Sequence, residues 1–261
     1  MTLICIEEHA IDQSIAEAAN PVLAREAPYM RMQSSSSSPV HPGPGRRPAV
    51  DIKEALRLGA DLGWERIRRM DEHGIDMQIV SWTSPIQLVP DDQAIALCRS
   101  ANDSLSKAVT AHPDRLQGLA ALPWQQPAAA VDELGLRGVL ILGRPGAGFL
   151  QVISGHWGEM VPFYLSRLDD VLSPGDTGLS RTITEVYRSN VWVTPSGMFH
   201  RPQFDFVRAV VGLDRLVWSV DYPFLHLDGT REFLDELDIT PEEREKITHL
   251  NAERLFGLRG V

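Results

Sequence analysis

Short apolar segments alternate with longer amphipathic ones along most of the chain, and this order is what most constrains the fold. The apolar segments are typical of buried strands and centre near residues 3, 77, 117, 139, 152, 191 and 216. Helical periodicity is found at 52–72, 94–111, 127–134, 159–170 and 203–210, and again from Thr230 and Pro241. Such alternation predicts a parallel sheet covered by helices. A (β/α)8 barrel typically takes about 250 residues, so we expect residues 1–261 to form a single α/β domain with a TIM-barrel-like fold.

One connection is too short for a regular barrel. Only nine residues, rich in glycine, separate Leu142 from Val152. A crossover between neighbouring parallel strands takes about a dozen residues or more, usually including a helix. The sequence therefore predicts seven strands, or eight with one recruited from an irregular segment, and a barrel that is incomplete or distorted between residues 142 and 152.

Residues 34–48 predict a long surface loop. This segment holds five consecutive serines and four prolines, a composition that excludes a helix or an inner strand. It carries too little apolar surface to offset the entropy of ordering. We therefore expect it to be mobile or to lie against another subunit.

Charge and hydropathy exclude several classes of partner. The net charge is −10, which disfavours nucleic acid because phosphates need a basic face. Arg66, Arg68 and Arg69 alternate with acidic residues on one helix and indicate a solvated face. No apolar run approaches the roughly 18 residues of a membrane span, and the N-terminus lacks the basic start of a secretory signal. With Cys5 and Cys98 expected as buried thiols, the sequence predicts a cytoplasmic protein.

Polar residues of catalytic type follow three of the predicted strands. Period two places Glu7 and His9 on one face at the carboxyl end of the first strand, the end at which barrels place their active sites. His156 follows the strand at 152–154, with Glu159 in the next helical turn, where a carboxylate can fix the tautomer of a proton-transferring imidazole. Asp221 follows the strand ending at Val220 and suits a metal ligand.

Each of these features has an ordinary alternative. A strand can simply end in polar residues, a histidine can cap a helix, and an aspartate before a proline can serve a turn. Three such features at strand ends point together to a metal or proton-transfer site. The sequence shows no glycine-rich phosphate fingerprint, no CxxC pair and no nucleophile-elbow serine.

Four motifs together resemble the aromatic-acid decarboxylases of the amidohydrolase-like superfamily, a group that includes the γ-resorcylate, 2,3-dihydroxybenzoate and 5-carboxyvanillate decarboxylases. They are Glu7-Glu8-His9, Ile153 to Glu159, Thr194 to Phe199, and Trp218 to Pro223. The resemblance extends from residue 3 to about 258. It implies a homo-oligomeric enzyme, dimer or tetramer, that removes CO2 non-oxidatively from a small hydroxylated aromatic acid.

The resemblance also implies roles for individual residues. Glu7, His9 and Asp221 are expected to bind a divalent metal, Zn2+ first, with Mn2+ or Mg2+ as alternatives. Asp221 is also expected to protonate the ring carbon. The resemblance assigns catalysis to His156, oriented by Glu159. Arg167 matches an arginine that reaches the substrate.

One departure from the family pattern falls at the short connection before Val152. Family members carry a further strand there, which ends in another metal-binding histidine, whereas no histidine lies between His112 and His156 in this chain. The chain therefore resembles a decarboxylase shortened by one βα unit. Two alternatives stay open, namely a hydrolase or hydratase on the same scaffold and a non-catalytic relative with an incomplete metal site.

Overall fold

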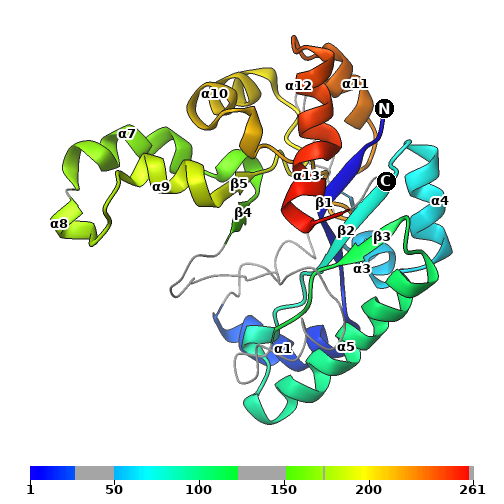
Figure 1. Cartoon of the computed structure of the whole chain (residues 1–261). Coiled ribbons are helices and arrows are strands. Elements are labelled where there is room, and N and C mark those ends of the chain that lie inside the picture. Colours follow the sequence, from blue (N-terminus) through cyan, green and yellow to red (C-terminus); the bar gives the residue numbers. More distant parts are fainter. Residues whose placement is uncertain (27–49, 123–150, 173, 259–261) are drawn as a thin grey trace. The chain divides into compact units, whose positions relative to one another are not determined.

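The computed structural model describes residues 1–26, 50–122, 151–172 and 174–258 (Figure 1). The loop at 34–48, the helix at 127–134, the strand near residue 139 and most of the short connection before Val152 lie outside these ranges. The described residues group into two compact units, treated separately below. The N-terminal unit comprises Glu7–Pro145 and Asp221–Asp228, and the C-terminal unit comprises Met1–Ile6, Gly146–Val220 and Gly229–Val261. The single domain over 1–261 stays a prediction.

The N-terminal unit contains the sheet that carries the first candidate residues. Its strands are β1 (Ile4–Ala10, of which residues 7–10 lie in this unit), β2 (Met77–Trp82) and β3 (Leu116–Gly118), in the order β1-β2-β3. β2 and β3 are parallel, with Gln78 opposite Leu116. The helical elements are α1 (Gln13–Glu26), α3 (Ile52–Ala60), α4 (Trp64–Glu72), η1 (Ile86–Leu88) and α5 (Asp91–Ala111). The parallel pairing agrees with the predicted order of strands and helices.

The C-terminal unit continues the same alternation. β4 (Val152–Ser154) pairs in parallel with β5 (Val191–Val193). Its helices are α7 (Val161–Val171), α8 (Pro174–Thr177), α9 (Ile183–Asn190), α10 (Arg201–Val211), α11 (Thr230–Glu236), α12 (Pro241–Glu245) and α13 (Asn251–Phe256). The unit also has the 3-10 turns η2 (His156–Gly158) and η3 (Leu213–Arg215) and, between α12 and α13, the π-helix η4 (Lys246–Leu250).

The last predicted strand, 214–220, is wrong as a regular strand. Its first residues form η3, and Leu216 makes only an isolated parallel bridge to Val193. The segment still makes backbone hydrogen bonds to a neighbour on each side. Val217 N donates to Val193 O at 3.0 Å, and Ile6 N donates to Trp218 O at 2.8 Å. It therefore occupies a strand position between β5 and the first residues of β1, with too few ladder bonds to count as a strand.

One predicted helix needed correction, and other helices were missed. The helix expected over 52–72 is broken at Asp61, whose carboxylate accepts from the backbone N–H of Arg66 at 2.7 Å and so begins α4. α1 and α9 were not predicted. α9 does carry a local signal, because Thr182 and Glu185 form a reciprocal capping box at its start.

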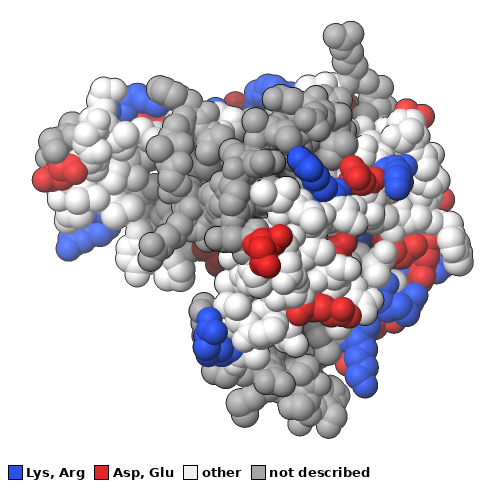
Figure 2. All heavy atoms as spheres, turned by 90° about the horizontal axis from the view of Figure 1, so that it is seen from below, with Lys and Arg blue, Asp and Glu red and all other residues white. Residues whose placement is uncertain are grey.

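The solvated arginine face was only partly right. Arg68 is exposed and pairs with Glu72, but Arg66 is completely buried beside Met70, one helical turn along α4. On the face drawn in Figure 2, the coloured basic and acidic side chains are interspersed. Cys5 and Cys98 are buried thiols rather than a disulfide, as predicted, and burial raises the pKa of Cys98 to about 12. Among the described residues, no helix has the length and apolar character to cross a membrane.

Candidate active site

His9 and Asp221 meet at one end of the N-terminal unit. His9 Nε2 lies 3.1 Å from Asp221 Oδ1, and the two side chains are 8% and 18% exposed. The backbone holds them in place, since His9 N donates to the carbonyl oxygen of Tyr222 at 2.6 Å. The imidazole also packs against Phe224, with ring centroids 5.8 Å apart. Two residues that the sequence placed at different strand ends are therefore brought into direct contact.

Ser81, from β2, fixes the orientation of the His9 ring. Its Oγ lies 3.0 Å from His9 Nδ1, and its hydroxyl can donate to the carbonyl oxygen of Glu8 at 3.5 Å. In the tautomer that carries its proton on Nδ1, Oγ accepts from Nδ1–H, and Nε2 presents a lone pair to the Asp221 carboxylate. Two acceptors facing each other at 3.1 Å need a proton or a cation between them. The pair therefore suits a divalent metal, for which imidazole nitrogen and carboxylate oxygen are common ligands.

A complete three-ligand set is not assembled. The described residues contain no group of three or more His, Cys, Asp or Glu side chains that could hold a metal ion. Glu7, the third predicted ligand, lies on β1 with its side chain partly exposed. A catalytic zinc site usually has three protein ligands and one open position, so the metal role of Glu7 stays a prediction.

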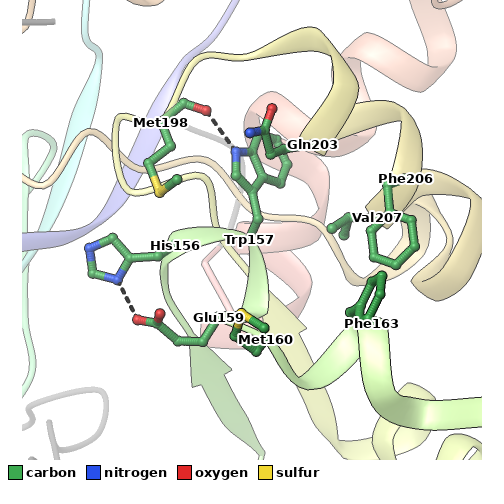
Figure 3. A pocket seen from close by; sticks show the side chains of 9 residues that line it. All are labelled: His156, Trp157, Glu159, Met160, Phe163, Met198, Gln203, Phe206 and Val207. Carbon is green, nitrogen blue, oxygen red and sulfur yellow. Dashed lines mark hydrogen bonds and ion pairs between the residues drawn. The ribbon is translucent and has the colours of Figure 1, made fainter. Parts of the chain in front are cut away.

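His156 and Glu159 form the second candidate pair, in the C-terminal unit. His156 Nδ1 lies 2.9 Å from Glu159 Oε1, and Figure 3 marks this contact with a dashed line. The turn that carries them is tied to the segment after β5, because the backbone N–H of His156 donates to Ser196 Oγ at 2.8 Å and Trp157 Nε1 donates to the Met198 carbonyl at 2.7 Å. The predicted orientation of His156 by Glu159 thus agrees with the geometry.

This pair lies at the edge of an apolar pocket of about 270 Å³. The walls come from η2, α7, α10 and the residues between them, and Figure 3 shows Phe163 and Phe206 close together on one side. The lining residues are His156, Trp157, Glu159, Met160, Phe163, Met198, Gln203, Phe206 and Val207. Arg167 does not line it and lies exposed on α7. Its contact with substrate remains a prediction.

Backbone strain is concentrated at the candidate residues. Six non-glycine residues in the described ranges have a positive φ, namely Glu7, His156, Trp157, Glu159, Ser196 and Asp221. Four of these six were singled out from the sequence as site residues. Such conformations cost about 1–3 kcal/mol each and occur mainly at functional sites. The backbone strain thus supports a functional role for the segments of Glu7 and Asp221 and for the turn that carries His156 and Glu159.

Gly158 should be required for the His156 turn. It has a φ of +79°, and a Cβ there would lie 2.7 Å from Tyr187 Oη and 2.8 Å from a Pro162 carbon. Backbone strain and crowding together predict that Gly158→Ala lowers the free energy of unfolding by about 2–4 kcal/mol. Gly257→Ala is the control, because Gly257 has a φ of +61° with open space around it and should lose only about 1–2 kcal/mol. Equal losses in urea unfolding would show that the crowding is relieved.

Sequence reasoning missed three residues that support the site. Ser81 and Ser196 were given no individual role, and Arg66 was placed in solvent. Hydroxyl and guanidinium groups act here through contacts between residues far apart in the chain, such as the 72-residue separation between His9 and Ser81. No local periodicity reports such a contact.

Comparison with known proteins shows what the chain is similar to. A family model described as Amidohydrolase matches residues 145–258. The γ-resorcylate decarboxylase of Rhizobium radiobacter is 26% identical over 297 aligned positions, which cover 80% of this chain and 91% of the relative. The decarboxylase orsB of Emericella nidulans is 25% identical, covering 75% and 85%. The first alignment is longer than the chain itself, so that relative has residues without a counterpart here, as a shortened chain predicts.

Solved structures show the same fold. A 5-carboxyvanillate decarboxylase from Novosphingobium aromaticivorans, complexed with manganese and 4-hydroxy-3-methoxy-5-nitrobenzoic acid, superimposes with a TM-score of 0.82 at 24% identity, covering 98% of this chain and 96% of that one. The 2,6-dihydroxybenzoate decarboxylase from Rhizobium gives a TM-score of 0.79 at 23% identity, with full coverage of both chains. These neighbours are TIM-barrel enzymes, which confirms the predicted fold class. Residues 145–258 of the chain are therefore similar to the amidohydrolase family, and most of the chain is similar to aromatic-acid decarboxylases.

Proposed function

We propose that this chain is a carboxy-lyase that removes CO2 without oxidation from a small hydroxylated aromatic carboxylic acid. The contact between His9 and Asp221 carries the proposal, because it brings a carboxyl group able to deliver a proton against an imidazole that fixes it. The similarity to decarboxylases over most of the chain supports the same reaction.

The reaction needs a proton at the ring carbon that bears the carboxylate. In our proposal the Asp221 carboxyl group delivers it, and the ring loses its aromaticity. The bond to the carboxylate carbon then breaks, CO2 leaves, and the electron pair of that bond restores the aromatic ring. Asp221 is left as a carboxylate and regains a proton from solvent. Proton transfer by a positioned side chain typically contributes about 10²–10⁴-fold to a rate.

The remaining residues orient the substrate and assist proton movement. His156 can accept or donate a proton through Nε2, because its Nδ1 is held by Glu159. Arg167 is proposed to bind the substrate carboxylate, for which a guanidinium offers paired donors.

Glu7, His9 and Asp221 are proposed to hold a divalent metal. A metal bound there would act as a Lewis acid and a template for the acid and its neighbouring hydroxyl. The sequence favours Zn2+, with Mn2+ or Mg2+ as alternatives, and the manganese bound in the similar 5-carboxyvanillate decarboxylase supports Mn2+. Because the described residues bring only two of these donors into contact, we expect weak metal binding.

The test measures metal content and CO2 release on one preparation. The protein is titrated with Zn2+ and Mn2+ and assayed with 2,6-dihydroxybenzoate and 2,3-dihydroxybenzoate, with benzoate as the control that lacks hydroxyls. We expect metal-dependent CO2 release from a dihydroxybenzoate, slow because a loosely held site loses positioning. Metal binding without CO2 release would favour the hydrolase or hydratase alternative. Neither metal nor turnover would favour the non-catalytic alternative.

The oligomeric state and the cellular location are proposed from fewer observations than the reaction. We infer a homo-oligomer, dimer or tetramer, from the family resemblance. Exposed apolar side chains such as Met160 and Phe163 support it. The cytoplasmic location rests on the sequence alone.

A further inference from the structure

Arg66 is a buried charge, and each of its three guanidinium nitrogens donates a hydrogen bond. Its side chain is fully buried in α4. Nε donates to the Asp61 carbonyl at 2.9 Å, one terminal nitrogen donates to Gln78 Oε1 at 3.0 Å, and the other donates to the His9 carbonyl at 2.7 Å. Each donation goes to a different segment, so the guanidinium joins the start of α4, β2 and the end of β1.

Glu8 extends this network to the segment that carries Asp221. One Glu8 carboxylate oxygen accepts from Gln78 Nε2 at 3.4 Å and from the backbone N–H of Tyr222 at 3.3 Å. The Arg66 guanidinium also lies over the Tyr222 ring, 4.9 Å from its centroid. Burial lowers the pKa of Arg66 and raises that of Tyr222, and their mutual attraction opposes both shifts.

The network fixes the chain on both sides of the candidate pair. Arg66 holds the carbonyl of His9, while the N–H of His9 donates to the Tyr222 carbonyl at 2.6 Å. Glu8 holds the N–H of Tyr222, the residue that follows Asp221, across 214 positions of sequence. The main chain is therefore held at His9 and at Tyr222, the neighbour of Asp221, in addition to the side-chain contact between His9 and Asp221.

Stability alone does not account for such an arrangement. Removing an arginine and a glutamate from water costs several kcal/mol per ion, and apolar residues of similar volume are often as stable in their place. Such a cost is expected where a site needs fixed geometry, because mutation of residues that orient a site typically lowers activity about 10–100-fold.

We propose that Arg66, completed by Gln78 and Glu8, is a positioning residue that holds His9 against Asp221. It touches neither substrate nor reacting atoms, and it acts through the main chain of His9. This inference rests on the proposed function for its effect on turnover, but its effect on the His9 ring can be measured without activity.

The test compares Arg66→Lys with Arg115→Lys. Lysine keeps the charge but cannot reach three separate acceptors. Arg115 is a matched control in the same unit, because it donates to Asp71 and to the carbonyls of Asp76 and Ile75, away from His9. With 15N-histidine-labelled protein at one pH, the ring signals of His9 are assigned by their loss in His9→Gln. His73, which bonds to Arg69, is an internal reference.

In Arg66→Lys we expect the His9 ring signals to shift or broaden while those of His73 stay in place, and kcat to fall about 10–100-fold with little change in KM. Arg115→Lys should leave the His9 signals and kcat unchanged. Unchanged His9 signals in a folded Arg66→Lys protein would overturn the proposal, as would equal effects of the two variants. If Arg66→Lys does not fold, Gln78→Met, which cuts the link to Glu8, is expected to shift the same signals, and no shift there would also overturn it. A wild-type protein without turnover removes the proposed function but leaves the NMR comparison decisive.

Discussion

Asp221→Asn is expected to lower kcat for CO2 release by about 10²–10⁴-fold, because an amide cannot deliver the proton that the ring carbon requires. Asparagine keeps the shape of the side chain and can turn its amide NH2 toward the lone pair of His9 Nε2, which lies 3.1 Å from Asp221 Oδ1 in the wild type. The fold should therefore be preserved, and the loss should appear in steady-state kinetics at saturating substrate.

Asp228→Asn is the matched control for this experiment. Asp228 belongs to the same short segment, is 79% exposed and pairs with His73 at 3.3 Å. Its kcat should stay within about twofold of wild type, since exposed pairs contribute about 0–1 kcal/mol. If Asp221→Asn kept more than a tenth of the wild-type kcat, the proton would have to come from another group, and His156 would be the first to examine.

Among the stability variants described, Trp218→Ala should lower the free energy of unfolding most, by about 3–5 kcal/mol. Trp218 is 2% exposed. It stacks on Phe199 at 5.3 Å between ring centroids and lies 6.2 Å from Phe233. Removing the indole leaves a large cavity in the core of the C-terminal unit, and urea unfolding followed by circular dichroism measures the cost.

Two further tryptophan variants give this prediction its controls. Trp64 is 72% exposed, so Trp64→Ala should change the free energy of unfolding by only about 0.5 kcal/mol. Trp218→Phe keeps most of the stacking and removes an indole N–H that has no hydrogen-bond partner among the described residues, so it should cost much less than alanine. A loss in Trp218→Ala as small as that in Trp64→Ala would contradict the packing around Trp218.

The sequence was most informative for features that depend on one helix or strand alone. The apolar runs at β1, β2, β4 and β5 and the helical periods of α5, α7 and α10 were located to within a few residues, because burial of one face imposes its own period. The same logic placed His9 and Asp221 at strand ends. The four motifs, taken together, predicted a resemblance to the aromatic-acid decarboxylases, which the comparisons support.

Only the tertiary structure decided which of these residues meet and what surrounds them. Arg66 lies in a helix whose charges alternate in sign, so the sequence indicated an exposed side chain. It is buried because its guanidinium bonds to Gln78 and to His9, which is 57 positions away in the chain. Ser81 gained its role in the same way. The strand expected at 214–220 lost most of its regular pairing because such pairing depends on neighbouring segments. A residue pattern reports the environment of one element, whereas the energy of a buried polar group depends on partners that other elements supply.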